Sequence, residues 1–454
     1  MTDSSSDLAD RLASAVTARD ARAVQALLEE EGAPPDAPGP DGLPLLCTAV
    51  AGFAPLTAAA LVEAGADQDR ALPDGSTPLL RAVDSGSPAL VTATLGKAPR
   101  LRLPEASRRR LLDLARHWHE TGAAEELGYR TGAAGPAVRR RIDDPDGDAI
   151  EEVSLGGRTV RNGHGAILTY LEWEFGVIPP VAEVVSRTLP QAQEDDSTWH
   201  TAAHTLSRRL GPRVRSELAA LRHHPDPVHR RFAASVLWHR GLLVTVDRVS
   251  DVAPDADFLA SWARDEADGE TLAAVLNAYN LHDHPAQEAV GLPHLTHPDP
   301  RVRSEAVFCA SAEQTARGDA ATSALLALVH DPTPDVRAAV AQALAVRFTA
   351  DGRLAPAHRD ALILLLRDDT SHVRRHAARS LSHSDDRATP TMDALLALLD
   401  EDDADLRLEA AAALAHRDDP RTAEACARVG PLDAFPDHDP RLFALWRYGT
   451  GPVR

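Results

Sequence analysis

The sequence predicts an all-α protein made of stacked helical repeats, an α-solenoid. One segment recurs in the second half of the chain, in runs that begin at Asp331, Asp368 and Glu401. Each run has an acidic turn, an apolar residue followed by Arg, and then Ala and Leu at helical spacing. A different segment recurs every 33 residues over the first hundred residues. Ala and Leu supply most of the apolar content and aromatic residues only 4%, which favours helices over sheets.

Length and charge limit the classes of protein that fit. The 454 residues exceed what one hydrophobic core supports, so we expect several folding regions or one long array. A formal charge of −20 argues against a surface devoted broadly to nucleic acid or anionic membrane. The three cysteines lie far apart, which indicates reduced thiols in a cytoplasmic protein. The N-terminus has no basic, apolar signal sequence, and no apolar run approaches the roughly 20 residues that span a bilayer.

Residues 1–104 carry the 33-residue repeat. The dipeptide Asp-Gly at 41–42 returns at 74–75, and each copy precedes a helix start and a second helix that ends near Gly. These Asp-Gly, Thr-Pro-Leu and Gly-Ala-Asp motifs resemble ankyrin repeats, which implies roughly three stacked helix pairs. Leu46 and Leu80 stand where that family has a His that links neighbouring turns, so the array departs from the family there.

Residues 105–194 are predicted to form a helical junction with one β-hairpin. Two alternating segments flank two glycines at 156–157, which indicates a hairpin near 151–162 and is the only strand pair that we predict. The run that follows is a predicted helix ended by Gly176, and a Pro pair at 179–180 starts the next one.

The longer repeat occupies residues 195–430, and each unit has a second helix. It resembles HEAT repeats, in the short form found in bacterial scaffold and lyase-like proteins. The resemblance implies about seven helix pairs in a superhelix with one concave face. Residues 431–454 are predicted to cap the last repeat. Aligned on the Arg position, the repeat recurs every 31 to 41 residues, at Trp199, Arg230, Thr271, Arg303, Arg337, Arg374 and Arg407.

The repeated Arg with its acidic turn has two interpretations. It could form a row of anion-binding groups. The resemblance implies instead a ladder between adjacent repeats, in which each Arg bonds a carboxylate or a carbonyl group. We favour the ladder, which predicts that replacing Arg337 or Arg374 lowers stability more than it alters binding.

The segment 198–250 differs in charge from the rest of the chain. It holds nine Arg against three acidic residues, so its local charge is +6 (9 − 3). This basic belt predicts an acidic partner. The alternative is that the belt faces the chain's own acidic inserts at 143–148 and 194–196. The candidate partner-binding residues are Trp199, Arg208, Arg209, Arg213, Arg215, Arg230 and Arg231.

No metal, cofactor or catalytic site is predicted. His200 and His204 share a helix face, but no Glu follows His200 directly and no Cys is near. Cys309 falls at a core position of a repeat helix, where an inert thiol is expected. The chain has neither a GxSxG turn nor a phosphate-binding loop.

The sequence therefore predicts a non-catalytic scaffold of the bacterial cytoplasm. It would bind another protein or peptide, acidic in character, on a concave solenoid face. The alternative is a HEAT-like repeat enzyme or nucleic-acid-binding protein, of the lyase-like or DNA-repair-like kind. Net charge and sparse aromatic residues argue against nucleic acid, although Trp199, Trp238 and Trp262 lie in or near the basic belt.

Overall fold

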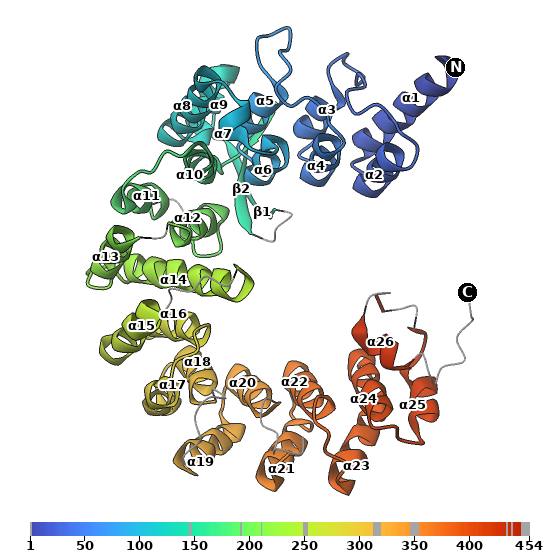
Figure 1. Ribbon diagram of the computed structural model, residues 1–454, viewed down its shortest axis with the longest axis vertical. Coiled ribbons are helices and arrows are strands. Elements are labelled where there is room, and N and C mark those ends of the chain that lie inside the picture. Colours follow the sequence, from blue (N-terminus) through green and yellow to red (C-terminus); the bar gives the residue numbers. More distant parts are fainter. Residues whose placement is uncertain are drawn as a thin grey trace. The chain divides into compact units, whose positions relative to one another are not determined.

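The computed structural model describes residues 2–144, 148–190, 193–209, 211–247, 253–311, 319–345, 354–432, 435–436 and 439–445 (Figure 1). It is mostly helical and divides into two compact units, residues 1–236 and 237–454. The boundary falls inside helix α14 (Pro227–Asp247). None of the described helices is long and apolar enough to cross a membrane.

Paired helices stack in a row at the start of the first unit (Figure 1). The turns between helix pairs recur 33 residues apart. Gly42 and Gly75 lie at equivalent places in two of them and take the same left-handed backbone, with φ of 77° and 76°. The Asp67 N–H donates to the Asp36 carboxylate at 3.0 Å and so joins two neighbouring turns. The helices of this row are α1 (Thr2–Ala18), α2 (Ala21–Glu29), α3 (Leu45–Ala51), α4 (Pro55–Glu63), α5 (Pro78–Asp84), α6 (Pro88–Leu95) and α7 (Pro99–Arg102).

A small antiparallel sheet in the order β1-β2-β3 follows these helices. Strands β2 (Ala149–Leu155) and β3 (Arg158–Arg161) form the predicted hairpin, and the glycines at 156–157 turn with φ of 59° and 78°. The prediction of a single strand pair was wrong, because β1 (Val138–Asp143) pairs with β2 as a third strand. Its residues are almost all exposed and three in a row are Arg, so β1 lacks the apolar alternation by which strands are found.

Backbone contacts fix the sheet to the turn between α5 and α6. The Arg161 N–H donates to the Ser85 carbonyl at 2.8 Å, and the Gly163 N–H donates to the Gly86 carbonyl at 3.1 Å. A Cβ atom on Gly86 would lie 1.8 Å from the Arg161 carbonyl oxygen. This approach therefore requires Gly at position 86.

Further helices of the first unit precede and follow the sheet along the chain. Helix α10 ends at Gly176 with φ of 75°, as predicted, and α11 starts directly after the Pro pair at 179–180. These helices are α8 (Glu105–Thr121), α9 (Ala123–Thr131), α10 (His164–Phe175), α11 (Val181–Thr188), α12 (Ser197–Ser207) and α13 (Pro212–Leu221).

The second unit has two layers of helices (Figure 1). Helices α18, α20, α22 and α24 are successive neighbours in one layer, and α19, α21 and α23 form the other. Helices α18 and α24 begin at capping side chains: Asp299 accepts a hydrogen bond from the Arg301 N–H and Asp403 from the Asp405 N–H, each at 2.9 Å. The α-helices are α15 (Ala253–Asp265), α16 (Gly269–Asn280), α17 (Gln287–Gly291), α18 (Pro300–Ala310), α19 (Asp319–Ala327), α20 (Pro334–Ala345), α21 (Pro356–Leu365), α22 (Ser371–Ser382), α23 (Thr389–Ala397), α24 (Ala404–His416), α25 (Thr422–Val429) and α26 (Pro440–Leu445). Among the described residues, short 3-10 turns lie at Leu292–Thr296, Leu328–His330 and Leu398–Asp400.

Arginines at equivalent positions of four successive repeats join neighbouring repeats in this unit. In each, Nη1 donates to the carbonyl group six residues earlier, at 2.8, 2.8, 2.9 and 2.7 Å for Arg303, Arg337, Arg374 and Arg407. Other guanidinium nitrogens face the carboxylate that opens the next repeat, in the pairs Arg303–Asp331 (2.7 Å), Arg337–Asp368 (2.6 Å) and Arg374–Glu401 (3.7 Å). The ladder interpretation is thus confirmed, and these arginines are not a row of free anion-binding groups.

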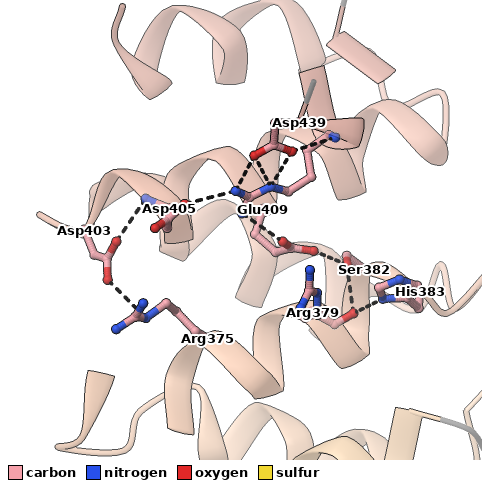
Figure 2. A network of polar contacts seen from close by, with 9 residues as sticks. Arg375, Arg379, Ser382, His383, Asp403, Asp405, Glu409 and Asp439 are labelled. Carbon is pink, nitrogen blue, oxygen red and sulfur yellow. Dashed lines mark hydrogen bonds and ion pairs between the residues drawn. The ribbon is translucent and has the colours of Figure 1, made fainter. Parts of the chain in front are cut away.

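The short helix α26 closes the first layer by a cluster of charges around Arg441. This guanidinium contacts Asp439 at 2.7 Å, Asp405 at 3.0 Å and Glu409 at 3.3 Å. Figure 2 shows these three carboxylates close together, with Ser382 of α22 hydrogen-bonded to Glu409. Helix α26 therefore packs on α24, and α24 in turn is tied to α22.

Candidate functional site

A groove of about 1150 Å³ lies in the first unit. Its walls come from α3, α5, α8, α9, the turn that precedes α5, and the β2–β3 turn with β3. Apolar side chains at Phe53, Leu80, Leu114 and Val160 line it together with charged ones. Because its walls come from stacked repeats and from the hairpin, the fold itself forms the groove without a bound partner.

A fixed polar network surrounds Asp84 at the α9 side of the groove. The Trp118 Nε1–H donates to Asp84 at 2.8 Å, and Arg130 Nη1 donates to the same carboxylate at 2.7 and 2.9 Å. The Arg130 guanidinium also lies over the Trp118 ring, 4.4 Å from its centroid. His164 stacks on Trp118 with 4.7 Å between ring centroids, and burial lowers the pKa of His164 to about 3, so its imidazole is neutral.

The neighbouring carboxylate Glu126 completes this network. It accepts hydrogen bonds from Arg130 Nε at 2.6 Å and pairs with His117 Nε2 at 2.8 Å. Burial opposes its ionisation, but the hydrogen bonds from Arg130 and His117 hold the pKa of Glu126 below its usual value. Every charge of this network has a partner within the chain, so the network shapes the groove and does not await a ligand.

A second fixed group lies in the turn before α5. Asp74 accepts hydrogen bonds from the Ser76 hydroxyl at 2.6 Å and its N–H at 2.9 Å, and Arg81 Nη2 donates to it at 3.0 Å. These hydrogen bonds, led by the one from the Ser76 hydroxyl, lower the pKa of Asp74 to about 2. Asp74 is therefore ionised at neutral pH and its charge is paired with Arg81.

Three further arginines, Arg109, Arg110 and Arg158, line the groove, and we call them its rim cations. Arg109 forms one exposed pair with Glu105 at 2.7 Å, and Arg110 donates to the Gly75 carbonyl at 2.9 Å. Arg158, at the start of β3, is exposed, and its guanidinium group has no hydrogen bond or ion pair within the part of the chain that the structure describes. The rim can therefore accept carboxylates from outside at little loss to the fold.

The residues of the basic belt are spread over α12, α13 and α14. Trp199 is 2% exposed, donates to Ser235 at 3.1 Å and meets Phe232 edge-on, so it belongs to the core and not to a surface. Arg209 is 5% exposed and donates to the Pro179 carbonyl at 2.6 Å, so it too is removed from solvent.

The other five predicted belt residues contact their own chain to different extents. Arg208 is exposed, with its guanidinium 5.4 Å from the Trp173 ring centroid, and Arg213 pairs with Glu217 at 2.8 Å. Arg215 lies half-buried on α13. Arg230 donates to the His224 carbonyl at 2.9 Å, as a ladder arginine does, and Arg231 is ion-paired with Glu194. Of the seven predicted belt residues, Trp199 and Arg209 are thus buried, whereas Arg208 and Arg213 are exposed.

Acidic residues of the two inserts pair with some side chains of the segment 198–250. Besides Arg231–Glu194, His200 lies 3.9 Å from Asp148. Asp195 instead pairs with Arg141 of β1. These contacts support the interpretation that the belt faces the chain's own acidic residues. Arg248 and residues 145–147 lie outside the described residues.

The histidines and the thiol of Cys309 are the groups to consider for a metal or catalytic site. Among the described residues, no group of three or more His, Cys, Asp or Glu side chains is placed to hold a metal ion. Cys309 is buried at a core position, as predicted; its Sγ donates to the Asn280 side-chain oxygen at 2.9 Å, and burial raises the pKa of its thiol. Asn280 also donates to Glu305 at 3.0 Å. Burial raises the pKa of Glu305 to about 7, against the effect of that hydrogen bond.

Comparisons with known proteins agree with the repeat architecture of the second unit. Residues 256–345 and 322–415 match the family model for HEAT repeats. HEAT repeats thus occupy residues 256–415. This match does not reach residues 1–104, whose assignment to ankyrin repeats stays a prediction. No curated protein matches the chain.

Two solved structures are similar at low identity. The crystal structure of the YibA protein of Escherichia coli is 18% identical with a TM-score of 0.41, and the match covers 58% of this chain and 90% of that one. The crystal structure of an engineered protein is 14% identical with a TM-score of 0.38, and covers 93% of this chain and 99% of that one.

The groove was missed by sequence reasoning for a simple reason. Its residues come from six separate elements, and none forms a motif along the chain. The one available signal was the hairpin between two repeat arrays, whose glycines at 156–157 place β3 and Arg158 at the groove.

Proposed function

We propose that this protein is a non-catalytic scaffold that holds a segment of a partner protein in the groove of its first unit. The groove of about 1150 Å³ is the observation that carries the proposal. Its volume suits several side chains of a peptide, and its lining combines apolar and charged groups as binding sites do. Because its polar network is already satisfied within the chain, little ordering is needed on binding.

The partner segment is acidic in this proposal. The rim cations Arg109, Arg110 and Arg158 line the groove, and their present contacts are few and exposed. The exposed belt residues Arg208 and Arg213 remain a second candidate surface for the same partner. Charge of this kind raises the rate of encounter and selects against basic partners.

Two further parts of the proposal concern class and location. We assign residues 1–104 to an ankyrin-type array, on the resemblance of their turn motifs and on the regular 33-residue spacing of their turns. We place the protein in the bacterial cytoplasm, where its three free cysteines would stay reduced.

The alternative function, nucleic-acid binding or a lyase-like activity on HEAT-type repeats, has less support. The formal charge of −20 opposes a polyanion. Titration of labelled duplex DNA at low salt tests it. We expect no binding in the micromolar range, and tight, salt-dependent binding would favour the alternative.

A site-specific cross-link tests the scaffold proposal. A photo-reactive phenylalanine analogue placed at Arg158 should cross-link a discrete protein from bacterial lysate, identified by mass spectrometry. The same group at Leu56, which is 67% exposed and does not line the groove, is the matched control. Arg109→Glu should weaken the product at position 158. Equal products at both positions, or none at position 158, would contradict the groove as the binding site.

A further inference from the structure

Strand β1 is an unpaired edge of the three-stranded sheet. The order β1-β2-β3 leaves one side of β1 without a neighbouring strand (Figure 1). Five of the six residues of β1 are exposed. A six-residue edge of this kind is about 20 Å long and can template a further strand.

The register of the sheet shows which backbone groups face outward. The Asp144 N–H donates to the Asp148 carbonyl at 2.8 Å, and Arg140 lies opposite Glu152 in the same ladder. Hydrogen-bonded and non-hydrogen-bonded residue pairs alternate along an antiparallel ladder. Arg140 lies an even number of residues from Asp144, so its backbone also bonds to β2, whereas the backbones of Arg139 and Arg141 do not. The N–H and C=O groups of Arg139 and Arg141 therefore point away from β2.

The pairing of β2 with β3 agrees with this assignment of the outward-facing backbone groups. The Asn162 N–H donates to the Glu151 carbonyl at 2.8 Å, so Glu151 faces β3 and its neighbour Glu152 faces β1. Among the described residues, no backbone group of β1 bonds to anything but β2.

Three consecutive residues of this edge strand are arginines, with the side chains of Arg139 and Arg141 on one face of the sheet and that of Arg140 on the other. Arg139 pairs with Glu151, Arg140 with Glu152 and Arg141 with Asp195, and the arginine side chains keep 53%, 70% and 44% of their exposure. Exposed ion pairs of this kind contribute little to stability, so carboxylates of a partner can replace or share them.

Charge decides between the possible occupants. A second copy of β1 in an antiparallel pair would set two rows of arginine against each other, and like charges across a ladder are destabilising. Arginines on an edge also discourage pairing with uncharged strands. An extended segment with carboxylates at alternate positions suits both the outward backbone groups and the cations.

We propose that β1 binds an extended acidic segment of a partner protein as a fourth strand of the sheet. The added strand exchanges main-chain hydrogen bonds with Arg139 and Arg141, and its carboxylates face the arginine side chains. This site lies on the sheet edge opposite β3 and does not depend on the groove proposal.

The test uses a fluorescein-labelled heptapeptide of alternating Val and Glu, and fluorescence anisotropy with the full chain at low salt. A heptapeptide of alternating Val and Lys is the charge control. Arg139→Ala removes the side chain but keeps the outward N–H, whereas Arg139→Pro removes both and leaves the bonds to β2 intact. We expect Arg139→Ala to weaken peptide binding about twofold. Arg139→Pro should weaken it about fivefold more than Arg139→Ala does.

A second measurement guards against misfolding of the Pro variant. Peptide binding to the unmodified chain should slow hydrogen exchange at the Arg139 and Arg141 amides, while the Arg140 amide, already bonded to β2, changes little. Equal affinity of the Ala and Pro variants with no change in exchange would show binding by charge alone and would overturn the proposal. So would the absence of binding, which would leave the arginines as guards of the edge. Neither result bears on the cross-link at Arg158.

Discussion

Substituting Arg337 by Ala tests whether the ladder carries the stability of the second unit. Its guanidinium donates to Asp368 at 2.6 and 2.8 Å and to the Asp331 carbonyl at 2.8 Å. The two side chains of the pair are 13% and 8% exposed. Breaking a buried pair from one side destabilises by about 3–5 kcal/mol, because the remaining charge stays buried without a partner. The small residual exposure places the expected loss at the lower end, about 3 kcal/mol.

The assay is urea unfolding followed by far-UV circular dichroism. A double-mutant cycle with Asp368→Ala should give a coupling energy of about 2 kcal/mol, since the second change removes the orphaned carboxylate. Arg367→Ala is the matched control; Arg367 is exposed and no ion pair joins it to another described residue, so it should change stability by less than about 0.5 kcal/mol. A loss for Arg337→Ala no larger than for the control, or a coupling near zero, would refute the ladder as a stabilising element.

The same pair has a defined dependence on pH. The hydrogen bonds from Arg337 hold the pKa of Asp368 well below its usual range. A carboxyl group with a depressed folded-state pKa contributes stability above its unfolded value of about 3.9 and loses it as the pH falls further. The difference between the unmodified chain and Arg337→Ala should therefore shrink below about pH 4. A difference that stays constant in acid would contradict the assignment.

Three other substitutions give distinct results. Arg441→Ala should destabilise the packing of α26 on α24 by about 2 kcal/mol, seen as faster proteolysis of the C-terminal residues; unchanged proteolysis would contradict this. The pKa of Glu305 is raised from 4.5 to about 7, so its contribution is complete below the unfolded value and is lost as the pH rises to about 7. Glu305→Gln should remove this fall of about 3 kcal/mol in the free energy of unfolding between pH 4.5 and 8, measured in urea; an unchanged pH profile would count against it. Gly86→Ala should destabilise by about 4 kcal/mol, because the new Cβ meets the Arg161 carbonyl, whereas Gly32→Ala, with the same φ of 71° and nothing within 4 Å, should lose only about 1 kcal/mol in thermal unfolding.

The repeat was predictable because its determinants are local. Each ladder arginine lies six residues after its carbonyl acceptor, so one turn and one helix start contain both groups. The left-handed turn at Gly75 and the helix end at Gly176 follow from single residues in the same way. Such short-range geometry can be read along the chain without knowing the tertiary structure.

The site could not be predicted because its residues meet only after folding. Asp84 and Arg130 are 46 positions apart, and nothing in either segment marks the other as its partner. The strand β1 gave no signal, since three exposed arginines in a row resemble a loop. The belt was overestimated for the opposite reason, because charge counted along the chain ignores the burial of Arg209 and the pairing of Arg231.

The double use of one residue in the ladder has a consequence for how such a protein evolves. Asp331 gives its carbonyl to Arg337 of its own repeat and its carboxylate to Arg303 of the preceding one. Asp368 serves Arg374 and Arg337 in the same manner. Donor and acceptor are thus encoded at the same positions in these consecutive copies. Duplication or loss of a whole repeat in the gene recreates the pair at the new junction and leaves no charge without a partner, so the length of the array can change in single steps.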